Sequence, residues 1–236
     1  MVDVRKIRVC VPIPARSLRE AFAMIRRAEE SGADIIELRL DYMGSELLDA
    51  LDRLKDFVKY TSVPLIATNR HAGQGGMWNL SEEQRINVLL KAAEAGFTYV
   101  DFELVTEGLR DVVGAVKTYG ARVIISFHDF NSTPSLSELE RIVRAEVEAG
   151  ADICKVVTMA NGLDDSIKCL ILTYEVSQKY DVICFAMGRY GLLSRVLSPI
   201  FGASFTYASL GVGFETASGQ LTIEDLREIY GRLGVE

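Results

Sequence analysis

Short apolar runs alternate with longer amphipathic runs along the whole chain. Every side chain in residues 182–187 is apolar, which is typical of a strand buried on both faces of a parallel sheet. In residues 17–31 apolar side chains recur every three or four positions, which predicts a helix with one face on a core. The predicted strands are residues 7–12, 34–40, 64–70, 99–104, 122–128, 152–159, 182–187 and 204–209. The predicted helices are residues 17–31, 45–59, 81–96, a stretch that ends near 119, 135–149, 164–179, 192–200 and 222–233.

This alternation amounts to eight strand–helix units and predicts an α/β fold with a parallel sheet inside and helices outside. Eight units in 236 residues fit a (β/α)8 TIM barrel, in which active sites lie at the C-terminal ends of the strands. The main alternative is an open doubly wound sheet. Such a sheet usually has a glycine-rich turn after its first strand, where this chain has Pro-Ile-Pro-Ala at residues 12–15. No linker interrupts the pattern, so we expect a single catalytic barrel domain over residues 1–236.

Composition and charge narrow the class of protein. The chain is 49% hydrophobic and 25% charged, as in an ordinary globular protein. No apolar run approaches the ~20 residues that cross a membrane, so we expect no membrane association. The residues up to Lys6 lead directly into the first strand, so we also expect no signal peptide. A net charge of -7 without a basic cluster argues against a nucleic-acid partner.

The cysteines and histidines point to a reducing compartment and away from a metal site. None of the four cysteines forms a CxxC pair, which predicts buried free thiols and a cytoplasmic location. His71 and His128 are far apart and outside any HExxH pattern, so we expect no metal ligand set.

One lysine, Lys155, lies inside an apolar strand, within the sequence Ile-Cys-Lys-Val-Val-Thr-Met. The chain has eight lysines, and the other seven lie in polar or helical surroundings. A buried ammonium group is costly, so such a lysine must pair, extend to water or lose its proton. Since a neutral amine can attack a carbonyl carbon, Lys155 indicates Schiff-base chemistry on a small carbonyl substrate.

Other predicted strands also carry ionisable side chains near their C-terminal ends. Because side chains alternate between the two faces of a strand, Glu37 shares a face with Arg39, and Asp101 shares one with Glu103. Any one of these residues could equally be half of a structural ion pair. Convergence of six such groups from five strands is better explained by a substrate site. The six are Glu37, Arg39, Arg70, Glu103, His128 and Lys155.

Two glycine-containing loops follow strands on the same side. Residues 72–76 lack the Lys-Ser/Thr of a phosphate-binding loop, so we expect a mobile loop there. The loop at residues 211–220 is long and contains glycines, which suits a lid that excludes water.

These segments together resemble the type I 3-dehydroquinate dehydratases of the shikimate pathway. The resemblance covers nearly the whole chain, and the combination of motifs is specific although no single motif is. The motifs are Glu37-Leu38-Arg39-Leu40-Asp41, Thr68-Asn69-Arg70 with Gly75-Gly76, Asp101-Phe102-Glu103, Ser126-Phe127-His128-Asp129-Phe130, Lys155-Val156-Val157, Met187-Gly188 with Gly191 and Ser194-Arg195, and Gly219-Gln220.

The resemblance implies a carbon–oxygen lyase that converts 3-dehydroquinate to 3-dehydroshikimate without a metal or organic cofactor. Lys155 would form a Schiff base with the C3 ketone. His128 would remove the C2 proton and then protonate the departing C1 hydroxyl in a syn elimination, and Glu103 would orient His128. The substrate-binding residues that the resemblance implies are Glu37, Arg39 and Arg70 near the hydroxyl groups, Arg195 and Gln220 on the carboxylate, and Thr216 in the lid.

The chain departs from the family's pattern at two places. The lid commonly reads Ser-Ala-Pro-Gly-Gln, whereas here residues 216–220 read Thr-Ala-Ser-Gly-Gln, and Pro12 stands where the first strand often has a serine. Without the proline we expect the lid to be freer before closure.

Two other functions are compatible with these residues. A class I aldolase would also place a lysine on the sixth strand, but most such aldolases need a phosphate site near the last two strands. That region offers Ser194, Arg195 and Gln220, which suit a carboxylate. A barrel that only binds a small carboxylate would have no need of an imine-forming lysine. The family includes dimers, so a homodimer is a further expectation, although the sequence does not identify an interface.

Overall fold

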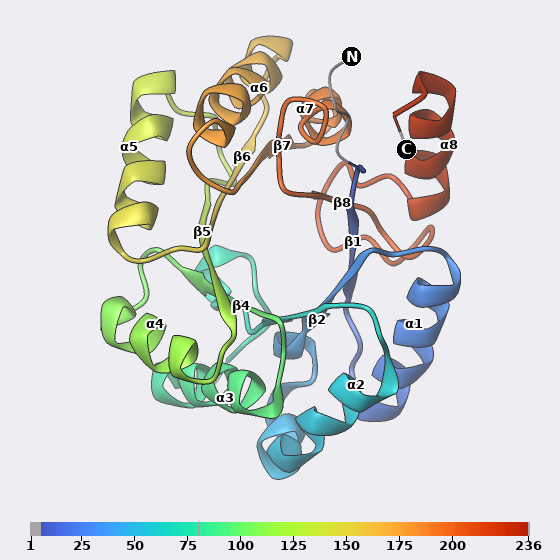
Figure 1. Cartoon of the computed structure of the whole chain (residues 1–236), viewed down its shortest axis with the longest axis vertical. Coiled ribbons are helices and arrows are strands. Elements are labelled where there is room, and N and C mark those ends of the chain that lie inside the picture. The colour runs from blue at the N-terminus through green and yellow to red at the C-terminus, as the bar shows by residue number, and fades with distance from the viewer. Residues whose placement is uncertain (1–5, 80, 236) are drawn as a thin grey trace.

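Eight parallel strands stand around a common axis in the computed structural model, which describes residues 6–79 and 81–235 (Figure 1). The strands are β1 (Val9–Ile13), β2 (Ile35–Arg39), β3 (Leu65–Thr68), β4 (Tyr99–Glu103), β5 (Arg122–His128), β6 (Ile153–Met159), β7 (Val182–Met187) and β8 (Thr206–Tyr207). Residues 1–5, to which the expectation about a signal peptide refers, lie outside the described residues.

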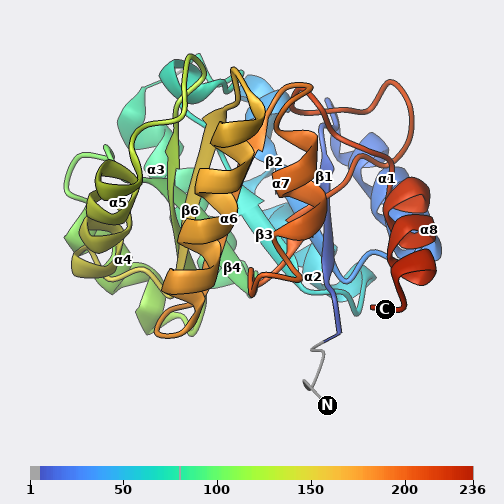
Figure 2. The same cartoon turned by 90° about the horizontal axis from the view of Figure 1, so that it is seen from above.

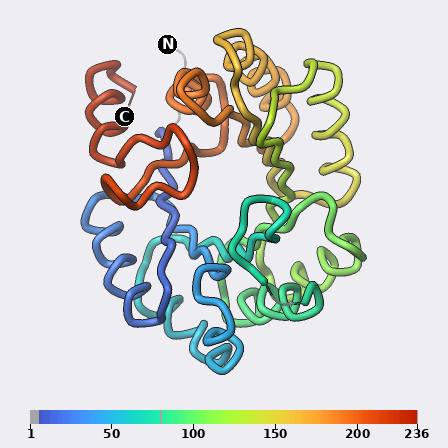
Figure 3. Tube along the Cα trace, turned by 180° about the vertical axis from the view of Figure 1, so that it is seen from behind, coloured from blue at the N-terminus to red at the C-terminus, as the bar shows by residue number. Residues whose placement is uncertain are grey.

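The strand order shows that the sheet curls into a nearly closed barrel. Neighbouring strands pair in the order β7-β6-β5-β4-β3-β2-β1-β8, so the first strand lies beside the last (Figure 3). At the remaining seam, the backbone N–H of Ser204 donates to the carbonyl of Val182 at 2.8 Å. An open doubly wound sheet would not follow this sequential order. The prediction of a single-domain (β/α)8 barrel is therefore confirmed.

Helices surround the barrel (Figure 2). They are α1 (Leu18–Glu30), α2 (Leu54–Tyr60), α3 (Glu82–Ala95), α4 (Leu109–Thr118), α5 (Leu136–Glu148), α6 (Leu163–Ser177), α7 (Leu192–Leu197) and α8 (Ile223–Leu233). Ser17 and Thr222 cap α1 and α8 by accepting hydrogen bonds from backbone N–H groups of the first turn. The predicted helix at 45–59 is instead a 3-10 segment, Gly44–Arg53, followed by α2, and the backbone leaves the helical range at Ala50.

Alternation along each strand divides the core into two layers. Outward-facing residues such as Val11 and Val156 pack beneath the helices, and inward-facing residues such as Ile35 and Ile153 fill the lower half of the barrel. Two positions further along a strand the inward side chain is polar, for example Lys155 after Ile153. The barrel therefore has an apolar floor beneath a polar upper layer, and this places the ionisable residues at the C-terminal ends of the strands.

Two predictions from composition can be compared with the structure. All four cysteines are free and buried, as predicted. Within residues 6–79 and 81–235, the structure contains no helix with the length and apolar character needed to span a membrane.

Candidate active site

A cavity lies at the C-terminal ends of the strands. Eight of the nine predicted site residues line it, and Glu103 is the exception. The eight are Glu37, Arg39, Arg70, His128, Lys155, Arg195, Thr216 and Gln220. Four of these are cations and only Glu37 is a carboxylate, so an acidic protein presents a positively charged cavity that suits an anionic ligand.

Lys155 enters the cavity from the middle of β6 and is 4% exposed. Its Nζ lies 2.8 Å from Asp101 Oδ2, 3.0 Å from the Tyr207 hydroxyl and 3.5 Å from Glu37 Oε1. Burial would raise the pKa of Asp101, but Arg70 and Lys155 outweigh it and hold that pKa well below its ordinary value. Asp101 is thus an anion beside the amine. Lys155 therefore forms an ion pair with Asp101 and also lines the cavity at the C-terminal ends of the strands.

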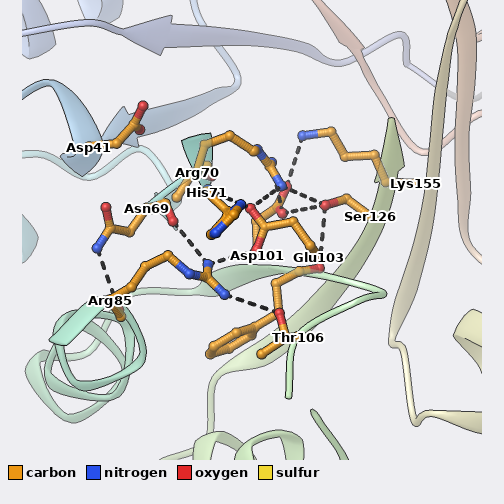
Figure 4. A network of polar contacts seen from close by, with 12 residues as sticks. Asp41, Asn69, Arg70, His71, Arg85, Asp101, Glu103, Thr106, Ser126 and Lys155 are labelled. Atoms are coloured by element: carbon orange, nitrogen blue, oxygen red, sulfur yellow. Dashed lines mark hydrogen bonds and ion pairs between the residues drawn. The ribbon is translucent and has the colours of Figure 1, made fainter. Parts of the chain in front are cut away.

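Arg70 links the carboxylates of β4 to the cavity (Figure 4). Its Nη2 lies 2.8 Å from Asp101 Oδ1, and its Nη1 donates to Glu103 at 3.0 Å and to the hydroxyl of Ser126 at 2.7 Å. Burial would lower the pKa of Arg70, but the Asp101 and Glu103 carboxylates reverse that effect and raise it. The guanidinium is therefore fixed in one orientation by neighbours from two strands.

Within residues 6–79 and 81–235, no hydrogen bond joins Glu103 to His128, so the predicted orienting hydrogen bond is not formed in this structure. One Glu103 oxygen accepts from Arg70 and from the backbone N–H of His71 at 3.0 Å. The other forms an ion pair at 2.7 Å with Arg85, a buried arginine of α3. Arg85 and Glu103 belong to one network of polar contacts, and Glu103 is absent from the cavity lining (Figure 4). In this geometry Glu103 positions Arg70.

His128 ends β5, and its imidazole stacks on Phe130 with ring centroids 6.0 Å apart. Its Nδ1 is buried and has no hydrogen-bond partner among the described residues. Burial, followed by the charges of Arg70 and Lys155, lowers the pKa of His128 well below 6.5. At neutral pH the imidazole is therefore neutral and can accept a proton.

Arg195 approaches the cavity from α7 and has no compensating anion within the described parts of the chain. It is 1% exposed, none of its three guanidinium nitrogens has a hydrogen-bond partner there, and its Cζ lies 4.3 Å from the centre of the Phe185 ring. Burial lowers the pKa of Arg195 to about 10. A buried, unpaired guanidinium fork in a cavity is a ready site for a carboxylate.

The end of the predicted lid lies beside Arg195 in the cavity lining. Thr216 and Gln220 both line the cavity, and the backbone N–H of Thr216 donates to the Gln220 side chain at 2.8 Å. Gly219 has a φ of 76°, and a Cβ at this position would lie 2.7 Å from the carbonyl oxygen of Gly188. Only glycine allows the segment to lie this close to the loop after β7.

The remaining lining residues are held by neighbours of their own. Arg39 makes two hydrogen bonds to Asp41, at 2.9 and 2.7 Å, and Glu37 accepts from the Thr68 hydroxyl at 2.7 Å. The loop at 72–76, expected to be mobile, contains a 3-10 turn (Ala72–Gln74), and a Cβ on Gly76 would overlap the Arg70 carbonyl. Its mobility stays a prediction, but in this structure it packs on the strand end.

Sequence reasoning assigned no role to three residues at the site. Asp101 is the nearest partner of Lys155, Tyr207 is the second, and Gln74 lines the cavity from the 3-10 turn. Strand alternation placed Asp101 on the inner face together with Glu103, and this signal could have identified it. Tyr207 lies in the predicted last strand, where an aromatic side chain by itself does not indicate a site. In the described parts of the chain, no group of three or more metal-ligating side chains lies close enough together to hold an ion.

Comparisons with known proteins agree with this geometry. A family model described as type I 3-dehydroquinase matches residues 9–236. A 3-dehydroquinate dehydratase of Dehalococcoides mccartyi is 39% identical over 208 residues, which cover 88% of this chain and 90% of that protein. One from Methanothermobacter thermautotrophicus is 36% identical over 228 residues, which cover 96% and 97% of the two chains. The crystal structure of 3-dehydroquinate dehydratase from Geobacillus kaustophilus superposes with a TM-score of 0.89 at 25% identity, covering 97% of this chain and 91% of that one.

Proposed function

The chain belongs to the type I 3-dehydroquinase family, and we propose that Lys155 and His128 carry out its reaction. The activity is the dehydration of 3-dehydroquinate to 3-dehydroshikimate, a hydro-lyase reaction of the shikimate pathway. The comparisons do not favour a class I aldolase. The observation that supports the assignment of residues best is one cavity lined by both a strand-borne amine, Lys155, and a neutral imidazole, His128.

In the proposed first half-reaction, Lys155 condenses with the C3 ketone and releases water. The resulting iminium withdraws electrons and acidifies the neighbouring C2 proton. Asp101 and Glu37 lie 2.8 and 3.5 Å from Nζ, so two carboxylates are available to stabilise the positive charge of the iminium.

In the second half-reaction, His128 removes the C2 proton and then delivers it to the departing C1 hydroxyl. A base must be unprotonated before it acts, and the lowered pKa of His128 meets that requirement. The C1–O bond breaks as the C1–C2 double bond forms, and the hydroxyl leaves as water. Hydrolysis of the iminium then frees 3-dehydroshikimate and restores Lys155.

We propose that Arg195 and Gln220 hold the substrate carboxylate, with Thr216 closing the lid beside them. The unpaired guanidinium of Arg195 supports this assignment. Arg39, Arg70 and Glu37 would contact the hydroxyl-bearing side of the substrate, and Glu103 would act through Arg70. These steps use side chains of the chain alone.

Turnover assays test this proposal. Lys155→Met should abolish the conversion of 3-dehydroquinate, because no imine can form. Lys91→Met is the matched control, since Lys91 is an exposed lysine that pairs with Glu94 on α3, and it should keep the wild-type rate. Wild-type turnover in Lys155→Met would contradict the proposal, as would a wild-type enzyme that turns over a phosphorylated sugar and leaves 3-dehydroquinate unchanged.

We also propose that two copies of the chain associate through the outer faces of α6 and α7, which lie side by side (Figures 1 and 2). Apolar side chains that are 37–60% exposed lie on these two helices and in the segments that flank α7, namely Leu163, Ile167, Ile171, Tyr174, Tyr190, Leu193, Ile200 and Phe201. Side chains of this size and exposure offer roughly 700 Å², close to the ~800 Å² that each partner contributes to a stable interface.

The mass in solution tests this association. Light scattering should give twice the chain mass of 26.1 kDa for the wild type. Ile171→Asp places a charge in the apolar face, so this variant should have the mass of one chain. Val105→Asp, at a 71% exposed position after β4, is the control and should stay paired. A wild type with the mass of one chain at micromolar concentration would contradict the interface.

A cytoplasmic location also stays a proposal, which the four buried free thiols support.

A further inference from the structure

The Tyr207 side chain reaches the barrel interior from β8 and meets Lys155. Its hydroxyl lies 3.0 Å from Nζ, its ring centre lies 4.6 Å from the same atom, and it lines the cavity. The hydroxyl accepts a hydrogen bond from Nζ, and within residues 6–79 and 81–235 no acceptor takes its own hydrogen. Tyr207 therefore contacts the reacting atom with a donor that is free to meet a ligand.

Imine formation on a lysine requires two protons to leave the nitrogen. The ammonium form of Lys155 carries three hydrogens, the iminium carries one, and the other two depart with the ketone oxygen as water. Direct transfer from nitrogen to that oxygen would pass through a strained four-membered ring. A group that accepts a proton from Nζ and donates another to the oxygen would avoid this strain.

Of the three polar groups that lie within 3.5 Å of Nζ in the described parts of the chain, the Tyr207 hydroxyl suits that task best. Asp101 already accepts from Arg70 and Ser126, and its pKa is held far below the ordinary range, so it takes up a proton poorly. Glu37 is more distant, at 3.5 Å, and it accepts from Thr68. A hydroxyl can accept one proton while it donates another, and it stays neutral throughout.

We propose that Tyr207 is a catalytic residue that relays protons from Lys155 Nζ to the ketone oxygen of the substrate. The relay rests on the proposed function, because it serves the imine of that mechanism. As the Nζ–C3 bond forms and the carbonyl electron pair moves to oxygen, Nζ passes one proton to the Tyr207 hydroxyl, whose own proton goes to that oxygen. A second passage converts the oxygen to water, the C3–O bond breaks, and the nitrogen lone pair completes the C=N bond. Burial raises the pKa of Tyr207 well above 10, so it starts each passage as a phenol.

Tyr207→Phe removes the hydroxyl but keeps the ring, which packs 5.6 Å from Phe205 and 6.0 Å from Phe185 between centroids. The matched control is Tyr230→Phe, because the hydroxyl of this buried tyrosine in α8 donates to the Val196 carbonyl at 2.8 Å and does not line the cavity. Each protein is mixed with 3-dehydroquinate, quenched with borohydride at successive times, and weighed intact by mass spectrometry.

We expect the adduct to accumulate about 10²-fold more slowly in Tyr207→Phe and at the wild-type rate in Tyr230→Phe. The final adduct in Tyr207→Phe should still be on Lys155, and the dissociation constant for substrate should be unchanged, which a merely structural role would not predict. Wild-type imine formation should also slow in D2O, because it moves protons through the relay.

Several outcomes would overturn the relay. These are a wild-type rate of adduct formation in Tyr207→Phe, a loss of rate that weaker substrate binding fully explains, and a wild-type rate unchanged in D2O. The last measurement needs no variant, so the proposal can fail even if Tyr207→Phe does not fold. Absence of any adduct in the wild type would overturn the Schiff-base mechanism together with the relay. Equal adduct formation in wild type and Tyr207→Phe would overturn the relay alone.

Discussion

Replacing Arg195 with methionine should raise the free energy of unfolding and weaken substrate binding at the same time. Arg195 is fully buried without a hydrogen-bond partner in the described structure, and burial lowers its pKa from 12.5 to about 10. Since a tenfold change in a proton equilibrium is about 1.4 kcal/mol, keeping this side chain charged in the fold costs about 3 kcal/mol. The pKa is lower in the folded than in the unfolded chain, so the cost is present at all pH values below about 10.

Methionine fills a similar volume without a charge. Imperfect packing will offset part of the gain, so we expect the free energy of unfolding to rise by about 1–3 kcal/mol. The same change removes the proposed partner of the substrate carboxylate. A charge-assisted hydrogen bond contributes about 1.5–3 kcal/mol, so KM should rise roughly 10²-fold. Urea unfolding at pH 7 measures the first effect, and steady-state kinetics with 3-dehydroquinate measures the second.

Arg85→Met is the matched control, because Arg85 is equally buried but paired. Its guanidinium lies 2.7 Å from both Glu103 and Glu82. Removing it leaves Glu103 less compensated, which should destabilise the fold by about 3–5 kcal/mol, the opposite sign. A lower stability of Arg195→Met than of the wild type would refute the claim that Arg195 is an unpaired buried charge. Equal protection of the wild type and Arg195→Met from unfolding by 3-dehydroquinate would refute the claim that Arg195 binds the substrate carboxylate.

Three further predictions concern His128 and Glu146. His128→Ala should lose 10²–10⁴ in turnover yet still form the Lys155 adduct with borohydride, and wild-type turnover would remove His128 from the mechanism. Burial, followed by the charges of Arg70 and Lys155, lowers the pKa of His128 below 6.5, and this base loses activity only once it is protonated. The decline of kcat/KM at acid pH should therefore have its midpoint below pH 6.5. A midpoint at or above pH 6.5 would contradict this prediction. Burial raises the pKa of Glu146 in α5 well above 4.5. Below pH 4.5 the carboxyl is protonated in both the folded and the unfolded chain, and as the pH rises its burial increasingly destabilises the fold. Glu146→Gln should therefore have a higher free energy of unfolding than the wild type at pH 8 and match it at pH 4. The exposed Glu148→Gln should match the wild type at both pH values. An equal effect of Glu146→Gln at both pH values would refute the argument.

The order of elements could be predicted from the sequence because periodicity reports burial directly. The strands at Arg122–His128 and Val182–Met187 have the predicted bounds, since the first has polar residues at both ends and Asp181 and Gly188 flank the second, which is entirely apolar. The last strand is only Thr206–Tyr207, shorter than the predicted 204–209, because ladder pairing to β1 covers only these two residues. Pattern shows which segments are buried, but pairing decides where a strand ends.

The positions of the site residues could be predicted better than their partners. Strand alternation placed Lys155, Glu37 and Arg39 in one cavity. It could not show that Arg85, from a helix, forms an ion pair with Glu103, because that contact depends on how α3 packs. Likewise, the sequence could not show that Asp101 is the partner of Lys155. Two carboxylates shared a face, and only the three-dimensional arrangement decides which of them meets the amine.

The central claim is that Lys155 forms the Schiff base with 3-dehydroquinate. Borohydride reduction during turnover, followed by proteolysis and mass spectrometry of the peptides, tests this claim most directly. We predict one adduct on the peptide that contains Lys155 and none on peptides that contain the other seven lysines. Continued turnover with an unmodified Lys155, or an adduct on a different lysine, would contradict the account.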